Sequence, residues 1–269
     1  MISGWQAEAL NTAPDSANEI HGDRMAKLYG FKGGLVPGVT ISAYLLQPAV
    51  TAWGTDFLNR GFAHVRVTAP LYDGEQFQVV IDTQEAASFT GRLLRPDGSE
   101  SANAEVRLEA HATAAPARRG DPIADQAYQG PTASPEVWHN LMSTGCVACR
   151  YRWGAEQNLP VYLRDAALMP DLLTGEEAFA NMAFILGTTN WVLAKNAYMN
   201  PWIHLETWSQ NYAAIPMNTQ VVVEMRVLEC FERKGHEFVD VDIALFDEKD
   251  DTCLSTVRLR AIYWLRGSQ

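Results

Sequence analysis

The chain has 269 residues, of which 47% are hydrophobic, 20% charged and 10% aromatic. This composition is typical of a globular protein with a large core, and it excludes a disordered chain, a collagen-like repeat and a small disulfide-stapled scaffold. Asp and Glu outnumber Lys and Arg by 32 to 21, which gives a formal net charge of -11. Because so acidic a chain is poorly suited to nonspecific binding of nucleic-acid phosphates, we expect no nucleic-acid partner.

The N-terminal sequence has no basic stretch followed by an apolar run. Nowhere in the chain do about 18 apolar residues follow one another without interruption, so we expect no membrane-spanning segment. The four cysteines are too few for a disulfide framework in a chain of this length. Together these features predict a soluble, cytoplasmic protein.

The first half of the chain predicts one helix followed by four strands. Apolar residues recur at intervals of three and four over 37–58, as in a helix buried over much of its circumference. Pro37 and Gly38 open this helix, and Pro48 is expected to kink or divide it. Four alternating, β-branched runs separated by turn signals then predict an antiparallel meander. These runs are 62–69, 76–83, 87–94 and 103–112.

The same order of elements returns in the second half. A long apolar segment at 176–197 is followed by four strand-like runs at 202–212, 220–230, 237–246 and 253–265. The stretch 114–135 is rich in Ala, Pro, Gly and Asp, which favours an exposed linker. We therefore expect an N-terminal repeat over 1–113, a linker over 114–135, and a C-terminal repeat, degenerate in its motif, over 136–269.

A long apolar helix in water can bury most of its circumference if a four-strand sheet wraps round it. Two such sheets placed edge to edge also cover an exposed strand edge on each. The wrapped helix is the arrangement of the hot-dog fold. The predicted fold class is therefore α+β, a double hot-dog of two helix-plus-antiparallel-sheet repeats in one chain, with two unrelated α+β domains as the alternative.

The segment before the first helix carries a specific motif. Asn18, His21 and Asp23 have the spacing Asn-x-x-His-x-Asp, and an Ala, a Gly-Phe pair and the Pro37-Gly38 helix start follow. This segment resembles the hydratase motif of the MaoC-like family, the (R)-specific enoyl-CoA hydratases and related dehydratases. The resemblance implies a lyase that adds or removes water at the double bond of an acyl-CoA or acyl-carrier thioester. It implies no cofactor beyond CoA as part of the substrate, and it is compatible with a homo-oligomer.

Hydration of an enoyl thioester needs a base that activates water, an acid for the α-carbon, and donors for the carbonyl oxygen. A neutral imidazole suits the first two tasks, so His21 is the predicted catalytic group. The amide of Gly38 at the helix start is predicted to polarise the thioester oxygen, and a glycine there would let substrate approach the backbone. Asn18 is grouped with the substrate-binding residues, with a loop-fixing role as the simpler interpretation.

One position departs from the family motif. Hydratases of this family carry an Asp five residues before the His, where this chain has Ser16, and the nearest acid is Asp15. Three alternatives follow: Asp15 reaches the site, Ser16 positions the water with His21, or hydration has been lost. A local role for both residues, in a turn or at a helix N-cap, is the structural alternative.

Two further clusters, one of arginines and one of cysteines, are candidates for binding roles. Arg150 and Arg152, near Arg164, are predicted to form a basic patch for CoA phosphates, with solvated arginines paired to carboxylates as the alternative. Cys146 and Cys149 have metal or redox spacing, but no second cysteine pair accompanies them. Since a zinc site needs about four ligands, they are interpreted as incidental thiols and no metal is expected.

The second half lacks a corresponding motif before its helix, so its expected role is structural, as walls for the acyl and CoA groups. His204, isolated near the start of a strand, is expected to be a pairing or surface residue. Two rival functions remain open. One is an acyl-CoA thioesterase, because the same helix start supports attack of water on the carbonyl, and the other is a non-catalytic acyl-thioester-binding protein with a decayed site.

Overall fold

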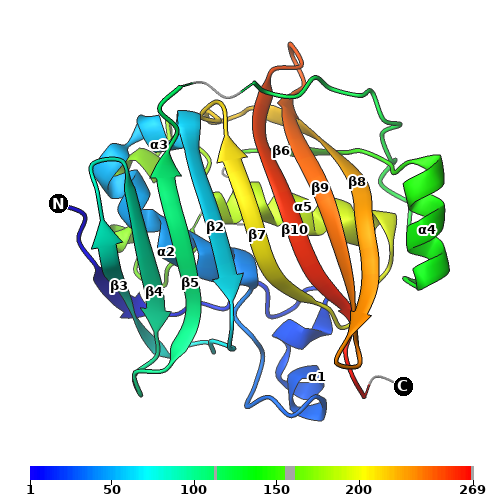
Figure 1. The fold of residues 1–269 in the computed structure, drawn as a ribbon, viewed down its shortest axis with the longest axis horizontal. Coiled ribbons are helices and arrows are strands. Elements are labelled where there is room, and N and C mark those ends of the chain that lie inside the picture. The colour runs from blue at the N-terminus through cyan, green and yellow to red at the C-terminus, as the bar shows by residue number, and fades with distance from the viewer. Residues whose placement is uncertain (112–113, 155–160, 268–269) are drawn as a thin grey trace.

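The computed structural model describes residues 1–111, 114–154 and 161–267, and its ten strands over these ranges form one antiparallel sheet (Figure 1). They are β1 (Trp5–Glu8), β2 (Gly61–Val67), β3 (Gln76–Gln84), β4 (Ser88–Leu94), β5 (Glu100–Leu108), β6 (Cys149–Arg152), β7 (Ile203–Asn211), β8 (Gln220–Arg233), β9 (His236–Asp247) and β10 (Cys253–Trp264). Their order across the sheet is β1-β3-β4-β5-β2-β7-β10-β9-β8-β6.

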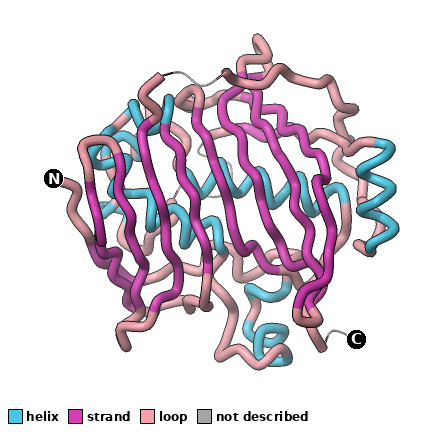
Figure 2. Tube along the Cα trace, viewed as in Figure 1, coloured by secondary structure: helices cyan, strands magenta, loops and turns pink. Residues whose placement is uncertain are grey.

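Two long helices, α2 (Gly38–Trp53) and α5 (Met182–Asn196), lie side by side against one face of the sheet (Figure 2). Shorter helices are α1 (Asp23–Leu28), α3 (Thr55–Arg60) and α4 (Pro135–Thr144), with single 3-10 turns η1 (Glu19–His21), η2 (Ala166–Leu168) and η3 (Asp171–Leu173). None of the described helices is both long and apolar enough to cross a membrane. The two helix-plus-sheet repeats make up the α+β double hot-dog that the sequence predicts.

Helix α2 shows why the first apolar segment folds as it does. Every residue from Gly38 to Val50 is buried, which accounts for apolar residues on all sides of the helix. The expected break at Pro48 is wrong: the helix runs through Pro48 to Trp53 and is interrupted at Gly54, after which α3 begins. Enclosure of the helix by the sheet and by α5 outweighs the one hydrogen bond that a proline cannot donate.

The strand order corrects the predicted meander. Strands β3, β4 and β5 follow one another in the sheet, but β2 pairs with β5 on one side and with β7 of the second repeat on the other. This β2–β7 pair joins the repeats edge to edge, as expected, with Val65 opposite Thr207. Each repeat also has a fifth strand, β1 or β6, whose four residues are too few to show an alternating pattern in the sequence.

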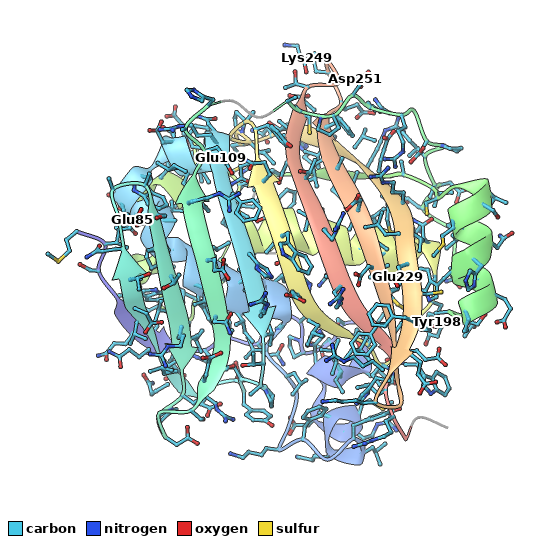
Figure 3. All side chains as sticks on the ribbon, in the orientation of Figure 1. Glu85, Glu109, Tyr198, Glu229, Lys249 and Asp251 are labelled. Carbon is cyan, nitrogen blue, oxygen red and sulfur yellow. The ribbon has the colours of Figure 1, made fainter. Side chains whose placement is uncertain are left out.

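The sheet face turned away from the helices carries polar side chains, as Figure 3 shows with Glu229 labelled on β8. Ion pairs run across the strands on this face: Arg66 contacts Glu206 at 2.6 Å, and Arg260 contacts Asp240 at 2.7 Å. The opposite face packs on α2 and α5. This division of the sheet into a polar and an apolar face explains the alternation in the strand sequences.

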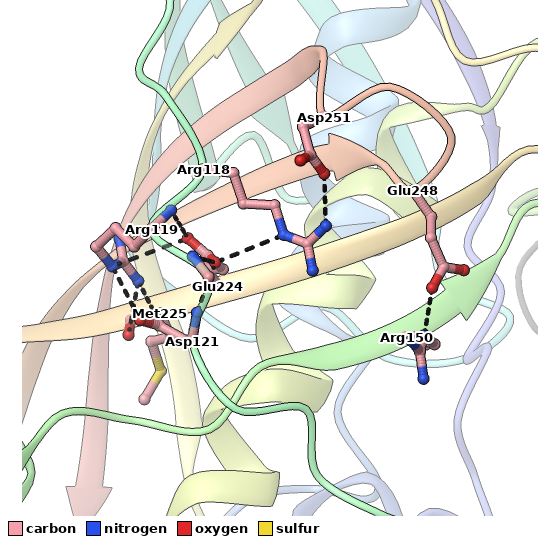
Figure 4. Close-up of polar contacts among 9 residues, drawn as sticks. Arg118, Arg119, Asp121, Arg150, Glu224, Met225, Glu248 and Asp251 are labelled. Atoms are coloured by element: carbon pink, nitrogen blue, oxygen red, sulfur yellow. Dashed lines mark hydrogen bonds and ion pairs between the residues drawn. The ribbon is translucent and has the colours of Figure 1, made fainter.

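The segment between the repeats contains no helix or strand in its described part before α4, in keeping with a linker. It is nevertheless anchored (Figure 4). The carboxylate of Glu224 on β8, whose exposed fraction is 0%, accepts hydrogen bonds from the backbone N–H groups of Arg119, Gly120 and Asp121 at 2.7 to 3.0 Å. Arg118 pairs with Asp251 beside them. The linker is therefore tied to the second repeat.

Candidate functional site

A cavity of about 180 Å³ lies where the N-terminal end of α2, the start of β7 and the segment from Ile20 to Val36 meet. Its walls are mostly aliphatic and aromatic. Among the described residues that line it, the ionisable side chains are those of two histidines, His21 and His204. The sequence placed only the first of them in the site.

His21 ends the 3-10 turn η1, directly before α1. Its ring nitrogen Nδ1 lies 2.8 Å from the carbonyl oxygen of Leu35, which only accepts, so Nδ1 carries the proton in this hydrogen bond. Nε2 is then the unprotonated nitrogen of the neutral ring, and the amide of Asn18 donates to it over a long 3.4 Å. The arrangement holds the imidazole as a base, with the Nε2 lone pair only weakly engaged.

The surroundings of both histidines favour the neutral form. Burial lowers the pKa of His21 below its usual range, and the hydrogen bond to the Leu35 carbonyl only partly opposes this. Burial also lowers the pKa of His204, to about 3, and the neighbouring His21 contributes in the same direction. Near neutral pH both rings are therefore uncharged and able to accept protons or hydrogen bonds.

The loop that carries His21 is fastened to the second repeat. The side chain of Asn18 bonds to both backbone groups of Trp202, donating to its carbonyl at 2.9 Å and accepting from its N–H at 3.1 Å. Glu19 and Asn200 exchange two more hydrogen bonds, each 2.9 Å. Asn18 thus fixes the loop in place, which is the loop-fixing role that the sequence offers as the simpler interpretation. These contacts do not support its assignment to substrate binding.

Asp23 fixes the other side of the same loop. Its carboxylate accepts a hydrogen bond from the backbone N–H of Gly34 at 2.9 Å, and this bond lowers the pKa of Asp23. The next residue, Leu35, supplies the carbonyl that orients His21. The Asn-x-x-His-x-Asp pattern is therefore a local scaffold in which the two flanking residues hold the histidine in place.

Gly38 is the first residue of α2, and its N–H has no hydrogen-bond partner in the described part of the chain. This places a free donor at the positive end of the helix dipole beside the cavity, as the sequence predicts for Gly38. The structure gives a further reason for a glycine at this position. A Cβ at this position would lie 2.9 Å from both Cδ2 and the carbonyl oxygen of His204, so the missing side chain makes room for β7.

The expectation that His204 is a surface residue is wrong, whereas it does pair across the sheet, with Ala261 on β10. Only 6% of this residue is exposed, and it lines the cavity. Strand β7 has an irregularity here: Glu206 lies opposite Arg260 and His204 opposite Ala261, so Leu205 is an extra residue. Strict alternation would put His204 on the polar face with Glu206, but the bulge turns it inward beside the buried Ala261.

The two alternatives offered for the missing carboxylate do not line the cavity. Asp15 is exposed, and Ser16 donates its hydroxyl to the carbonyl of Asn18 at 3.0 Å. Neither belongs to the described lining of the cavity. Both occupy the turn that precedes the motif, which is the structural alternative that the sequence left open.

Arg150 and Arg152 lie on β6, at the opposite edge of the second repeat from the cavity. Arg150 pairs with Glu248, and Arg152 donates to the side-chain oxygen of Asn218 at 2.8 Å. The structure therefore does not bring these two residues to the cavity, since β6 lies four strands from β7 in the sheet. Of the three arginines considered for this patch, Arg164 alone shares a groove with the motif residues His21 and Asp23.

An open groove of about 630 Å³ lies on the other side of the His21 loop. Arg164, Lys32 and Tyr72 line it, and His21 belongs to its wall as well as to that of the cavity. Arg164 pairs there with Asp73 at 2.9 Å. The loop that carries His21 is thus the common wall of a small apolar cavity and a larger polar groove.

The cysteines show no arrangement that binds a metal. Cys146 and Cys149 are free and buried, and burial raises the pKa of both thiols, that of Cys146 to about 11. Among the described residues, no group of three or more His, Cys, Asp and Glu side chains is placed to hold a metal ion.

No family model and no curated protein sequence matches the chain. Solved structures do match its fold. A double hot-dog protein from Mycobacterium tuberculosis, described as conserved and hypothetical, is 12% identical with a TM-score of 0.53, over 97% of this chain and 96% of the other. A putative thioesterase II from Thermobifida fusca is 12% identical with a TM-score of 0.52, over 97% and 92%.

A third match is the dehydratase domain of RzxB from Pseudomonas fluorescens, 12% identical with a TM-score of 0.51, over 86% of each chain. Similarity at this level of identity shows a common fold. The chain therefore has the double hot-dog fold of proteins described as thioesterases and of proteins described as dehydratases.

Proposed function

We propose that the protein acts on acyl thioesters and adds or removes water at the α,β double bond, as a hydratase of the MaoC-like type. The observation that carries this proposal is the geometry of His21. Its Nδ1 is fixed by the Leu35 carbonyl, so the neutral ring presents an unprotonated Nε2, and His21 lines the same cavity as Gly38, whose N–H is free at a helix N-terminus. Hydration of an enoyl thioester requires a base, an acid for the α-carbon and an oxyanion donor, and a single histidine can serve as the base and then as the acid.

The reaction follows from these positions. His21 Nε2 accepts a proton as the water oxygen bonds to the β-carbon and the π electrons of the double bond move toward the thioester carbonyl. The Gly38 N–H stabilises the negative charge that develops on the carbonyl oxygen. The proton on His21 is then delivered to the α-carbon, which completes the hydroxyacyl thioester. Dehydration is the same sequence in reverse.

The dimensions of the cavity indicate how a thioester would lie. A volume of about 180 Å³ is smaller than the roughly 300 to 1,000 Å³ of a site that encloses a drug-sized ligand. It is suited to a short acyl group with its thioester, while CoA or an acyl-carrier arm would remain outside. The open groove with Lys32 and Arg164 on the other side of the His21 loop offers space and cationic groups for that carrier.

The direct test is to incubate the purified protein with a short enoyl-CoA and with the matching saturated acyl-CoA, following loss of enoyl absorbance and release of free thiol. A hydratase consumes only the enoyl substrate and releases no thiol. The change His21→Ala should lower kcat about 10²- to 10⁴-fold, the usual effect of losing a general acid–base group. Asp15→Asn is the matched control and should leave kcat unchanged because Asp15 is exposed.

A thioesterase is the second candidate, and one observation favours it. No carboxylate is found among the described residues that line the cavity. Attack of water on the carbonyl needs a single base and an oxyanion donor, both of which are present. Thiol release from the saturated substrate would select this function, whereas thioester binding without turnover of either substrate would identify a binding protein and overturn both enzyme assignments.

A further inference from the structure

We propose that His204 is a second catalytic residue, and that its Nε2 and the Nε2 of His21 together accept the two hydrogen bonds of the reacting water. The inference rests on the proposed function, since it names the group that binds the water used in that reaction. It assigns to the second repeat a part in the chemistry, whereas the sequence pattern predicts only a structural role for that repeat.

The two imidazoles are held in the same way. His21 donates from Nδ1 to the Leu35 carbonyl, and Nδ1 of His204 lies 2.8 Å from the side-chain oxygen of Asn190 on α5. Because each Nδ1 faces an acceptor, each neutral ring carries its proton there and leaves Nε2 as an acceptor. Both residues line the same cavity.

The burial of His204 argues against a purely structural role. Only 6% of His204 is exposed. Its Nδ1 is hydrogen-bonded, but its Nε2 has no hydrogen-bond partner in the described part of the chain. Nε2 is not one of the fully enclosed side-chain atoms without a partner among the described residues, so it is open to the cavity that His204 lines. A strand residue that only packed would be better served by an apolar side chain, so an acceptor kept open toward the cavity indicates that it meets a ligand.

The chemistry of water explains why two acceptors are useful. A water molecule has two O–H donors, and if both are held by imidazole nitrogens the oxygen lone pairs point away from the rings and toward the substrate. His21 then takes one proton, and His204 holds the other hydrogen without removing it. In this way His204 supplies the second acceptor that Ser16 cannot provide, because Ser16 does not belong to the described lining of the cavity.

The bulge in β7 is what makes this arrangement possible. Without Leu205 as an extra residue, His204 would lie on the polar face of the sheet with Glu206. Asn190 then completes the site from α5, on the opposite side of His204 from Gly38 and α2. We therefore infer that Asn190 is a positioning residue, which sets the tautomer of His204.

The first test measures the tautomers and does not depend on turnover. Protein labelled with ¹⁵N-histidine gives long-range ¹H–¹⁵N correlations that distinguish the two nitrogens of each ring, and the variants His21→Ala and His204→Gln assign the two signals. At pH 7 we expect both rings neutral with the proton on Nδ1. A proton on Nε2 of His204 would overturn the proposal, since that nitrogen could then not accept from water.

The second test is kinetic. His204→Leu, which removes the acceptor, should lower kcat about 10²-fold or more, and His204→Gln, whose side-chain oxygen can accept, should lower it less. His64→Gln is the matched control, because His64 is a similarly buried strand histidine on the other face, bonded to Glu206 at 2.7 Å. It should leave kcat unchanged.

The outcomes separate the two proposals. Full activity in a folded His204→Leu protein overturns the role of His204 and leaves the proposed function standing. A wild-type protein that converts no thioester overturns the proposed function, and the tautomer of His204 then still decides whether the two rings form an acceptor pair. Loss of activity in His64→Gln equal to that in His204→Leu would also overturn the proposal, because the effect would then not be specific to the cavity.

Discussion

Acidification is predicted to destabilise the protein through His204. In the unfolded chain this imidazole titrates near pH 6.5, whereas burial lowers its pKa in the folded protein to about 3. Between these values the unfolded state binds a proton that the folded state does not, so the stability present above pH 6.5 is lost as the pH falls toward 3. Each pH unit in this range costs about 1.4 kcal/mol, so the free energy of unfolding should fall by about 2 kcal/mol between pH 6.5 and pH 5 through this residue alone.

Urea unfolding of the wild type and of His204→Gln at pH 7.5 and at pH 5 measures this contribution. Other titrating groups are common to both proteins and cancel in the difference between them. The wild type should therefore lose about 2 kcal/mol more than the variant over this interval. Equal losses would refute the reasoning, because they would mean that His204 is protonated in the folded protein about as easily as in the unfolded chain.

Two further changes test the scaffold of the site. Gly38→Ala should lower the free energy of unfolding by about 1 to 3 kcal/mol in urea unfolding, because the new Cβ would lie 2.9 Å from His204 atoms. A gain in stability of about 1 kcal/mol, as helix propensity alone predicts, would contradict this close approach. Asn18→Ala leaves both backbone groups of Trp202 without their partner, so the Trp202 amide should exchange faster with deuterium and kcat should fall as the His21 loop is released. Unchanged exchange at that amide would show that the loop is held by other contacts.

The amino-acid sequence alone determined the repeated architecture and one side of the site. Hydrophobic periodicity is a local property, so it identified the eight longer strands to within a few residues and located α2 and α5, although α5 begins six residues after the start of the predicted segment and the first predicted segment also covers part of α3. The spacing of Asn18, His21 and Asp23 is equally local, and in the structure the two flanking residues do hold the loop of the histidine. The four-residue strands β1 and β6 were missed because so short a stretch contains too little pattern.

Only the tertiary structure decided which side chains share the cavity. His204 lies far along the chain from His21, and its direction depends on one extra residue, Leu205, in the pairing of β7 with β10. A shift of one residue in a strand moves a side chain to the other face, and nothing in the local sequence marks where such a bulge falls. For the same reason Arg150 and Arg152 could not be placed from the sequence: the position of β6 at the far edge follows from strand order, which is set by contacts between segments distant in the chain.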